Sequence, residues 1–451
     1  MLAATAAMAR LTHGIAVRGR LEDPRAAGGH LGGPVHDAVH RDMVGMAVAA
    51  VPVVAGDHVG ALGVQDVGEG QLTPQTRSET LSTILIPDEI TSALDQLNTL
   101  AAEHAAQADR DGVLPLEVVT AIADAGVARH FVPARFGGTE GTFGELTAAM
   151  TTLGESCASA SWVGSIFAYT ARFVTHLPPL AQEEVWGASP DLLWASGLVP
   201  SGRSARTESG FRLSGRWAYV SGAEFADWVL LAGPQPEPGI EPPVFHAIPR
   251  GDFRVERTWD AIGMRATGSH TVVLEDVDVP AHRTVSLREV ATGRNSTSAT
   301  VQHNVPLLSL GGLTCVAPAL GAARSALSTT IANASPRRAG MPPELRALFD
   351  DSFARSAVEL DSAELLVDRM VGVLDSGQAP RLAIRNARDA GYAAQLIRGV
   401  VQRLMTAGGT FAQNRFGTLE RSWRDVFTGT SHAALRFEKA ASAYTDTQIQ
   451  A

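Results

Sequence analysis

Few residues in this sequence stand at spacings that carry chemistry by themselves. His36 and His40 are four residues apart and could face one metal ion on a helix, but the Gly-Gly-Pro stretch just before them breaks helices. Cys157 and Cys315 are far apart and lack metal or redox spacing, which is typical of a reducing compartment. There is no Walker loop, Rossmann glycine fingerprint, His-Glu-x-x-His motif or nucleophile elbow. We therefore expect no metal site, and the chemistry has to come from less familiar motifs.

The composition bounds the class of protein and its partners. The chain has 451 residues, of which 45% are hydrophobic and 19% charged, as in globular proteins. A formal net charge of -10 provides no basic surface, so we expect no binding to nucleic acid or to anionic membranes. No stretch reaches the roughly 20 apolar residues of a membrane helix, and the first ten residues do not resemble a signal peptide. These observations indicate a cytoplasmic protein.

The periodicity divides the chain into four parts. Residues 1–80 are rich in Ala, Gly, Val and His without a sustained period, which predicts a poorly structured N-terminal extension or an upstream stretch included by a wrong start. Residues 85–190 show helical spacing, and residues 191–290 contain short β-branched and aromatic segments separated by turn residues. From 298 to 445 the helical period returns. The predicted fold is α+β and mostly α: an N-terminal helical domain, a central antiparallel β-domain and a C-terminal helical bundle.

Five segments carry a resemblance to a known family. They are the turn 125–138, the strand pair 213–228, Gly263-Met264-Arg265 with 274–280, Ala407-Gly408-Gly409, and Arg421-Ser422-Trp423-Arg424-Asp425. In this order, on a helix–sheet–helix plan, they resemble the acyl-CoA dehydrogenase superfamily. The resemblance covers about residues 88–440, and it implies the same three-domain fold.

The residues also indicate which branch of that superfamily the chain resembles. Many acyl-CoA dehydrogenases hold a glutamate base in a Tyr-Glu-Gly-Thr stretch, where this chain reads Phe427-Thr428-Gly429-Thr430. A threonine cannot act as a base at neutral pH. The Thr-Glu-Pro-x-x-Gly-Ser-Asp segment of the dehydrogenases is missing too, and 193–198 stands in its place. These features resemble the two-component flavin monooxygenases of the same fold.

The resemblance implies roles around a flavin. Ser221 matches the residue whose hydroxyl faces flavin N(5), and His432 matches a histidine near the edge that becomes negative on reduction. We expect Trp217 and Arg338 to bind the cofactor as well, Arg338 or its neighbour Arg337 through the flavin phosphate. From the residues alone, Ser221 could equally end a strand and His432 could lie beside a helix cap.

Three further residues are expected to shape a substrate pocket. Trp162 matches an aromatic wall and Ser196 a polar group of the pocket. Members of the branch that hydroxylate phenols carry a histidine two turns after that tryptophan, where this chain has Tyr169 and Thr170, with His176 further on. Thr170 is therefore our third candidate. A tryptophan on a helix could also belong simply to the core.

The resemblance implies an oxygenase subunit that uses diffusible reduced FMN or FAD, without metal, to hydroxylate an aromatic or other electron-rich small molecule through a flavin hydroperoxide. It also implies a separate flavin reductase as partner and a homotetramer. Two alternatives stay open: an acyl-CoA dehydrogenase or oxidase with tightly bound FAD, and a flavin-binding helical protein without turnover.

Overall fold

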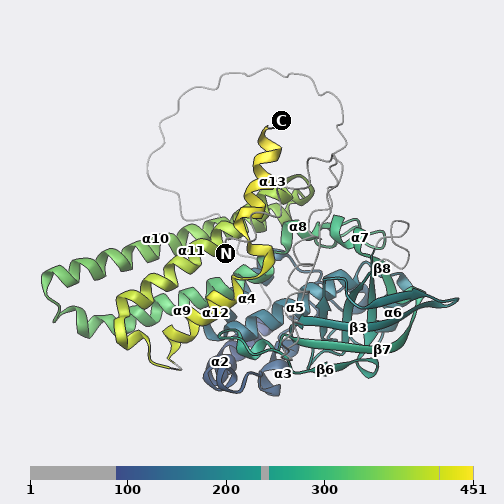
Figure 1. The fold of residues 1–451 in the computed structure, drawn as a ribbon, viewed down its shortest axis with the longest axis horizontal. Helices are drawn as coiled ribbons and strands as arrows, with labels where there is room; N and C mark the ends of the chain where they lie inside the picture. Colours follow the sequence, from purple (N-terminus) through teal and green to yellow (C-terminus); the bar gives the residue numbers. More distant parts are fainter. Residues whose placement is uncertain (1–87, 235–242, 416, 450–451) are drawn as a thin grey trace, which may run out of the picture. The chain divides into compact units, whose positions relative to one another are not determined.

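The computed structural model describes residues 88–234, 243–415 and 417–449 (Figure 1). The predicted extension 1–80, with His36 and His40, lies outside the described residues. Within the described part, helices come first, two small sheets follow, and long helices complete the chain, which confirms the predicted fold class.

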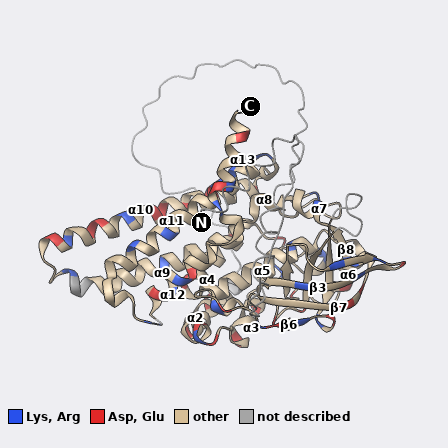
Figure 2. Ribbon diagram, in the orientation of Figure 1, with Lys and Arg blue, Asp and Glu red and all other residues tan. Residues whose placement is uncertain are grey.

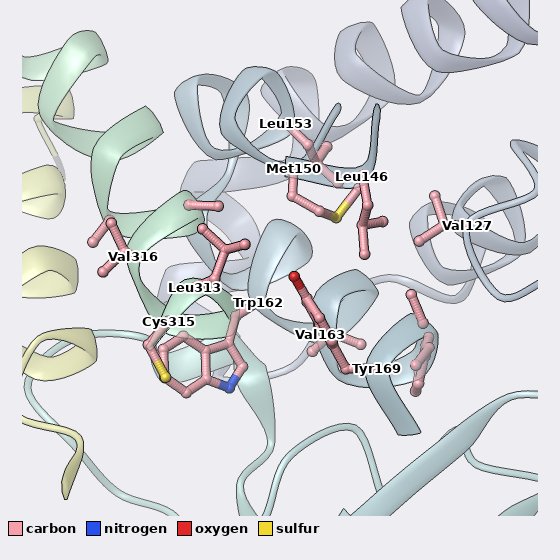
Figure 3. Packing of buried hydrophobic residues seen from close by; sticks show 14 of the residues in the cluster. Val127, Leu146, Met150, Leu153, Trp162, Val163, Tyr169, Leu313, Cys315 and Val316 are labelled. Atoms are coloured by element: carbon pink, nitrogen blue, oxygen red, sulfur yellow. The ribbon is translucent and has the colours of Figure 1, made fainter. Parts of the chain in front are cut away.

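Of the first helices, one is almost entirely buried. Their bounds are α2 (Asp88–Asp111), α3 (Leu116–Asp124), α4 (Phe143–Ser156), α5 (Ala158–Val174) and α6 (Pro179–Trp186). Helix α4 begins at a capping box, in which the Thr142 and Glu145 side chains each satisfy a backbone N–H of the first turn. Every residue of α5 except Ile166 is buried, because α5 packs against α4, the later helix α9 and strand β1. Figure 3 shows this packing, with labelled side chains such as Met150, Trp162 and Cys315.

The β-domain consists of two sheets of four strands each. The strands are β1 (Trp194–Gly197), β2 (Arg203–Arg206), β3 (Gly210–Val220), β4 (Trp228–Gly233), β5 (Val244–Pro249), β6 (Arg254–Glu256), β7 (His270–Pro280) and β8 (Thr284–Ser286). Their orders are β1-β4-β5-β8 and β2-β3-β7-β6. All described pairs are antiparallel except β1 with β4, which is parallel and departs from the antiparallel prediction.

A bulge in β3 points the Tyr219 side chain away from the β-domain core. The register of β3 on β7 shifts between Trp217 and Val220. Both of these residues are buried, whereas Ala218 and Tyr219 between them are exposed. Two residues therefore replace the one that regular alternation would allow, and Tyr219 adopts the left-handed φ of 62°.

The C-terminal helices form the bundle. They are α7 (Leu287–Thr292), α8 (Leu307–Leu310), α9 (Leu313–Arg338), α10 (Pro343–Asp375), α11 (Ala379–Ala412), α12 (Thr418–Gly429) and α13 (Phe437–Ile449). Charges of both signs are interspersed along α10 (Figure 2). Among the described residues, Leu307–Ala334 is, by length and composition only, long and apolar enough to cross a membrane, which corrects the expectation that no stretch would be. Because 78% of its apolar window is buried, it is a core segment of the bundle.

Two of the recognised motifs meet where the three domains join. Gly263 packs so closely on α12 that a Cβ there would lie 2.1 Å from the Arg424 carbonyl oxygen. Next to it, the backbone N–H of Met264 donates to the carboxylate of Asp425. Arg424 forms a bidentate ion pair with Asp109 of α2, with N–O distances of 2.9 and 2.6 Å. Through these contacts, the Gly-Met-Arg and Arg-Asp motifs connect the β-domain, α12 and α2.

Candidate functional site

Ser221 lies at the centre of a chain of hydrogen bonds that begins on helix α5. Trp162 Nε1–H donates to Ser221 Oγ at 3.0 Å, and Ser221 Oγ lies 2.7 Å from Ser269 Oγ. Ser269 Oγ lies 2.8 Å from Thr267 Oγ1, whose hydroxyl donates to the Met264 carbonyl oxygen at 2.9 Å. All four donating side chains are at least nine-tenths buried. We call Trp162, Ser221, Ser269, Thr267 and the Met264 carbonyl the hydroxyl relay.

The His432 ring contacts the indole ring of Trp162. The two ring centroids are 6.0 Å apart and the rings are inclined at 69°, an edge-to-face contact. The structure thus brings together Ser221, Trp162 and His432, which are more than fifty residues apart from one another in the sequence. Helix α5 contributes the tryptophan, the turn after β3 the serine, and the segment after α12 the histidine.

The tautomer of His432 follows from its backbone contact. Its Nδ1 accepts a hydrogen bond from the Ala434 backbone N–H at 3.3 Å, so His432 itself caps the short helix η7 (Ala433–Leu435). A neutral ring that accepts at Nδ1 carries its proton at Nε2. The side chain is exposed to solvent, although the surrounding protein still lowers its pKa through desolvation. Within the described residues Nε2 has no partner, so His432 presents an N–H donor.

Thr170 and Ser196 form a second pair of neutral hydroxyls. Thr170 Oγ1 donates to Ser196 Oγ at 3.0 Å, which joins α5 to β1. Thr170 is eight residues after Trp162 on the same helix, about 12 Å further along its axis. His176 is buried, and burial together with the Arg172 charge lowers its pKa to about 3, so it is a weak base. The pair Thr170–Ser196 is therefore polar without being charged or basic.

Two of the predicted cofactor ligands have other partners. Trp217 is 2% exposed, packs in the β-domain core and donates Nε1–H to the Ala232 carbonyl oxygen at 2.8 Å. Trp217 lies before the bulge on the same face of β3 as Phe211 and Leu213, so the structure places its side chain in the β-domain core. Arg338 at the end of α9 forms a bidentate pair with Asp350 of α10, at 2.7 Å for both N–O distances. Its charge is matched within the chain, and a phosphate would have to share or displace Asp350; the Arg337 side chain lies outside the described residues.

Sequence reasoning missed three residues next to Ser221. Ser269 and Thr267 belong to the hydroxyl relay, and Tyr219 presents a half-exposed ring whose centroid lies 6.2 Å from that of Trp259. Trp259 in turn donates Nε1–H to the Met264 carbonyl oxygen at 2.9 Å, where the relay ends. Only the bulge brings Tyr219 outward, and regular strand alternation gives no signal for it.

Burial also changes the pKa of Asp425, which lies beside the site where α12 meets the β-domain. Asp425 is 6% exposed, and desolvation raises its pKa to about 6, against the hydrogen bond from Met264 N–H that favours its charge. The separate depression of about 610 Å³ on the β-domain, lined by Gly251–Arg254, Val273 and Glu275–Asp278, contains none of these site residues. This depression is open to solvent and its charged side chains are mainly acidic, and we do not assign flavin or substrate binding to it.

Comparisons with known proteins agree with this architecture. A family model described as "Acyl-CoA dehydrogenase, N-terminal domain" matches residues 91–178, and one described as "Acyl-CoA dehydrogenase, C-terminal domain" matches residues 313–437. The chain belongs to the acyl-CoA dehydrogenase superfamily. Its relatives place it in the branch of the flavin-dependent monooxygenases.

Two relatives carry the name of that branch, and a solved structure with bound FADH2 has the same fold. The flavin-dependent monooxygenase oxygenase subunit HsaA of Rhodococcus jostii is 29% identical over 368 residues, covering 78% of this chain and 96% of the relative. The FADH(2)-dependent resorcinol hydroxylase oxygenase component of a Rhizobium species is 28% identical, with 75% and 88% covered. The solved structure of XiaF from a Streptomyces species, in complex with FADH2 and glycerol, is 27% identical, has a TM-score of 0.74 and covers 80% of this chain and 95% of XiaF.

Within the superfamily, the end of α12 distinguishes this chain from the dehydrogenases that hold a glutamate there. Thr428 takes that place, and its buried hydroxyl has no partner among the described residues. The next residue, Gly429, packs against Trp162, so that a Cβ there would lie 3.5 Å from the indole. The corner beside Trp162 and Ser221 therefore contains a hydroxyl and a glycine instead of a base.

Proposed function

We propose that this chain is the oxygenase subunit of a two-component flavin-dependent monooxygenase. It would take reduced flavin from a separate reductase and use O2 to hydroxylate an aromatic or other electron-rich small molecule. The observation that carries the proposal is the convergence of Ser221, Trp162 and His432 on one site, with Thr428 at the position where many dehydrogenases hold their glutamate base. The proposal includes a cytoplasmic location and a homotetramer, both expectations from the resemblance.

The donor and acceptor groups of the site fit a reduced flavin. Ser221 Oγ accepts one hydrogen bond from Trp162 and has capacity to accept another. His432 presents Nε2–H, which suits the pyrimidine edge where a reduced flavin carries negative charge. The exposed Tyr219 ring beside Trp259 provides an aromatic surface for a planar ring system. Bound reduced flavin would supply the two electrons that activate O2, of which one atom would go to the substrate and the other to water.

The chain's own residues would shield the reduced flavin and its reaction with O2 from bulk water. Trp162 and Ser221 are 9% and 6% exposed, so the hydroxyl that faces the flavin lies inside the protein and away from bulk water. His432 would stay neutral with its proton at Nε2, because desolvation by the surrounding protein lowers its pKa and Nδ1 accepts from the backbone. The residues thus bind, orient and exclude water, and no side chain has to remove a proton from carbon.

The flavin is proposed to be FAD, with FMN as the alternative to test. Two of the relatives described above carry FADH2 in their names or titles. The paired hydroxyls Thr170 and Ser196 would orient a neutral substrate by hydrogen bonds, since neither carries charge. A phenol or indole ring against Trp162 fits this combination.

The direct test is isotopic. The purified chain, a flavin reductase, FAD or FMN and 18O2 are incubated with a panel of phenols, resorcinols and indoles, and products are analysed by mass spectrometry. The proposal predicts a product with one 18O atom, and a Ser221→Ala variant that forms less product and more peroxide per flavin oxidised. A chain that binds reduced flavin but leaves the whole panel unlabelled would contradict the hydroxylase assignment.

A further inference from the structure

The two ends of the hydroxyl relay differ in their hydrogen-bonding capacity: one can only donate and the other can only accept. At one end, Trp162 Nε1–H has a hydrogen to donate and no lone pair to accept with. At the other end, the Met264 carbonyl oxygen can only accept, and the Thr267 hydroxyl donates to it at 2.9 Å. Between these ends lie three hydroxyls, each with one hydrogen, at oxygen–oxygen distances of 2.7 and 2.8 Å.

The two ends determine which hydroxyl donates to which along the relay. If Thr267 donates to Met264 O, Ser269 has to donate to Thr267, and Ser221 has to donate to Ser269. In this order every hydrogen has an acceptor and neighbouring bonds strengthen one another. In the reverse order the Thr267 hydroxyl would no longer donate to Met264 O. Without a ligand, the hydrogen of Ser221, a residue only 6% exposed, would also have no acceptor among the described residues, and an unpaired buried donor is costly.

We infer that the hydroxyl relay makes the site selective for reduced over oxidised flavin, with Ser269 and Thr267 as the positioning residues. The inference rests on the proposed function and adds to it. Because its hydrogen is committed to Ser269, Ser221 Oγ can offer a ligand only its remaining lone pair. Flavin N(5) carries a hydrogen in the reduced form and can donate to that lone pair. In the oxidised form N(5) is itself an acceptor, so two acceptors would face each other.

This selectivity suits a flavin that diffuses between two proteins. Reduced flavin delivered by the reductase is retained, and oxidised flavin loses its hydrogen bond at Ser221 and leaves. One hydrogen bond gained or lost corresponds to about a tenfold difference in Kd. Because binding is linked to reduction, a tenfold preference raises the midpoint potential of the bound two-electron couple by about 30 mV.

The experiment compares dissociation constants of reduced and oxidised FAD, then FMN, measured without oxygen by equilibrium titration, together with the potential of the bound flavin. Ser269→Ala and Thr267→Val each free the Ser221 hydroxyl to turn. We expect the ratio of oxidised to reduced Kd to fall about tenfold in both, mainly because oxidised flavin binds more tightly. Ser221→Ala should lower the same ratio by weakening the reduced form instead.

Thr330→Val is the matched control. Thr330 is a buried threonine on α9 whose hydroxyl also donates to a backbone carbonyl, that of Ala326, and its removal should leave the ratio unchanged. Tighter binding of oxidised flavin cannot result from a damaged fold, so it separates the relay from a structural role. A wild-type chain with equal affinity for both forms, or a ratio unchanged in Ser269→Ala, overturns the inference and leaves the monooxygenase proposal standing. A chain that binds neither flavin in either state overturns both.

Discussion

At the residue scale, the candidate site depends on neutral hydrogen-bonding groups instead of strong acids or bases. Motif matching predicted Ser221, His432 and Trp162, and the structure places these three in contact. It could not predict Ser269 and Thr267, because an isolated serine or threonine beside a strand is ordinary in any sequence. Regular alternation from Phe211 and Leu213 already points Trp217 into the core, whereas the β3 bulge after it turns Tyr219 outward.

The Thr170–Ser196 pair yields a prediction about substrate affinity. Thr170→Val keeps the shape of the side chain and removes the hydroxyl that donates to Ser196. We expect KM for the hydroxylated substrate to rise about tenfold, as for one lost hydrogen bond, with little change in the Kd of reduced flavin. Steady-state kinetics and flavin titration measure both quantities. Weaker flavin binding with KM unchanged would assign Thr170 to the cofactor.

Tyr219 yields a prediction about the cofactor. Its ring is half exposed beside Trp259, so Tyr219→Ala should raise the Kd of reduced flavin by about three- to tenfold through the loss of an aromatic contact. Tyr219→Phe keeps the ring and should bind like the wild type. Equal dissociation constants in all three proteins would remove Tyr219 from the site.

At the scale of elements, the junction of α12 with the β-domain positions the site. Gly263 has no room for a side chain, so Gly263→Ala has to displace α12 or its own loop. We expect this change to lower the free energy of unfolding by about 1–3 kcal/mol and to weaken flavin binding. Gly372→Ala is the control, because Gly372 lies in α10 with open space around it and alanine favours helix. Urea unfolding that leaves both variants as stable as the wild type would contradict the close approach.

Asp425 makes the stability of this junction depend on pH. Its pKa rises from 3.8 to about 6 on folding, so the folded chain holds this proton more tightly than the unfolded chain. That contribution is full below about pH 4 and is lost as pH rises through 6. Asp425→Asn keeps an acceptor for Met264 N–H, and its stability relative to the wild type should increase by about 1–3 kcal/mol between pH 4 and 7.5. Urea midpoints across this range measure the difference, and parallel curves would contradict the buried carboxyl.

At the scale of the whole molecule, helical and strand periods were sufficient to predict the order of the domains. They did not predict that β1 pairs in parallel with β4, because a four-residue strand carries no signal for its neighbour. They also did not predict the three-domain junction, since Asp109, Met264 and Arg424 are brought together only by tertiary packing.

The first eighty residues provide a test at this scale. The family match begins at residue 91, and every site residue discussed above lies between 109 and 432. We therefore expect a variant that lacks residues 1–80 to bind reduced flavin with the same Kd and to melt at the same temperature as the full chain. A large loss of either property would show that the N-terminal residues belong to the functional unit.

We propose that the site around Ser221 holds reduced flavin and controls its reaction with oxygen. The most direct measurement is rapid mixing of the protein and reduced FAD, then reduced FMN, with oxygenated buffer, while flavin reoxidation and peroxide release are followed. We expect peroxide release from the wild type to be roughly tenfold or more slower than from free flavin, and release from Ser221→Ala to be faster than from the wild type. Release at the rate of free flavin, in the wild type as in the variant, would contradict it.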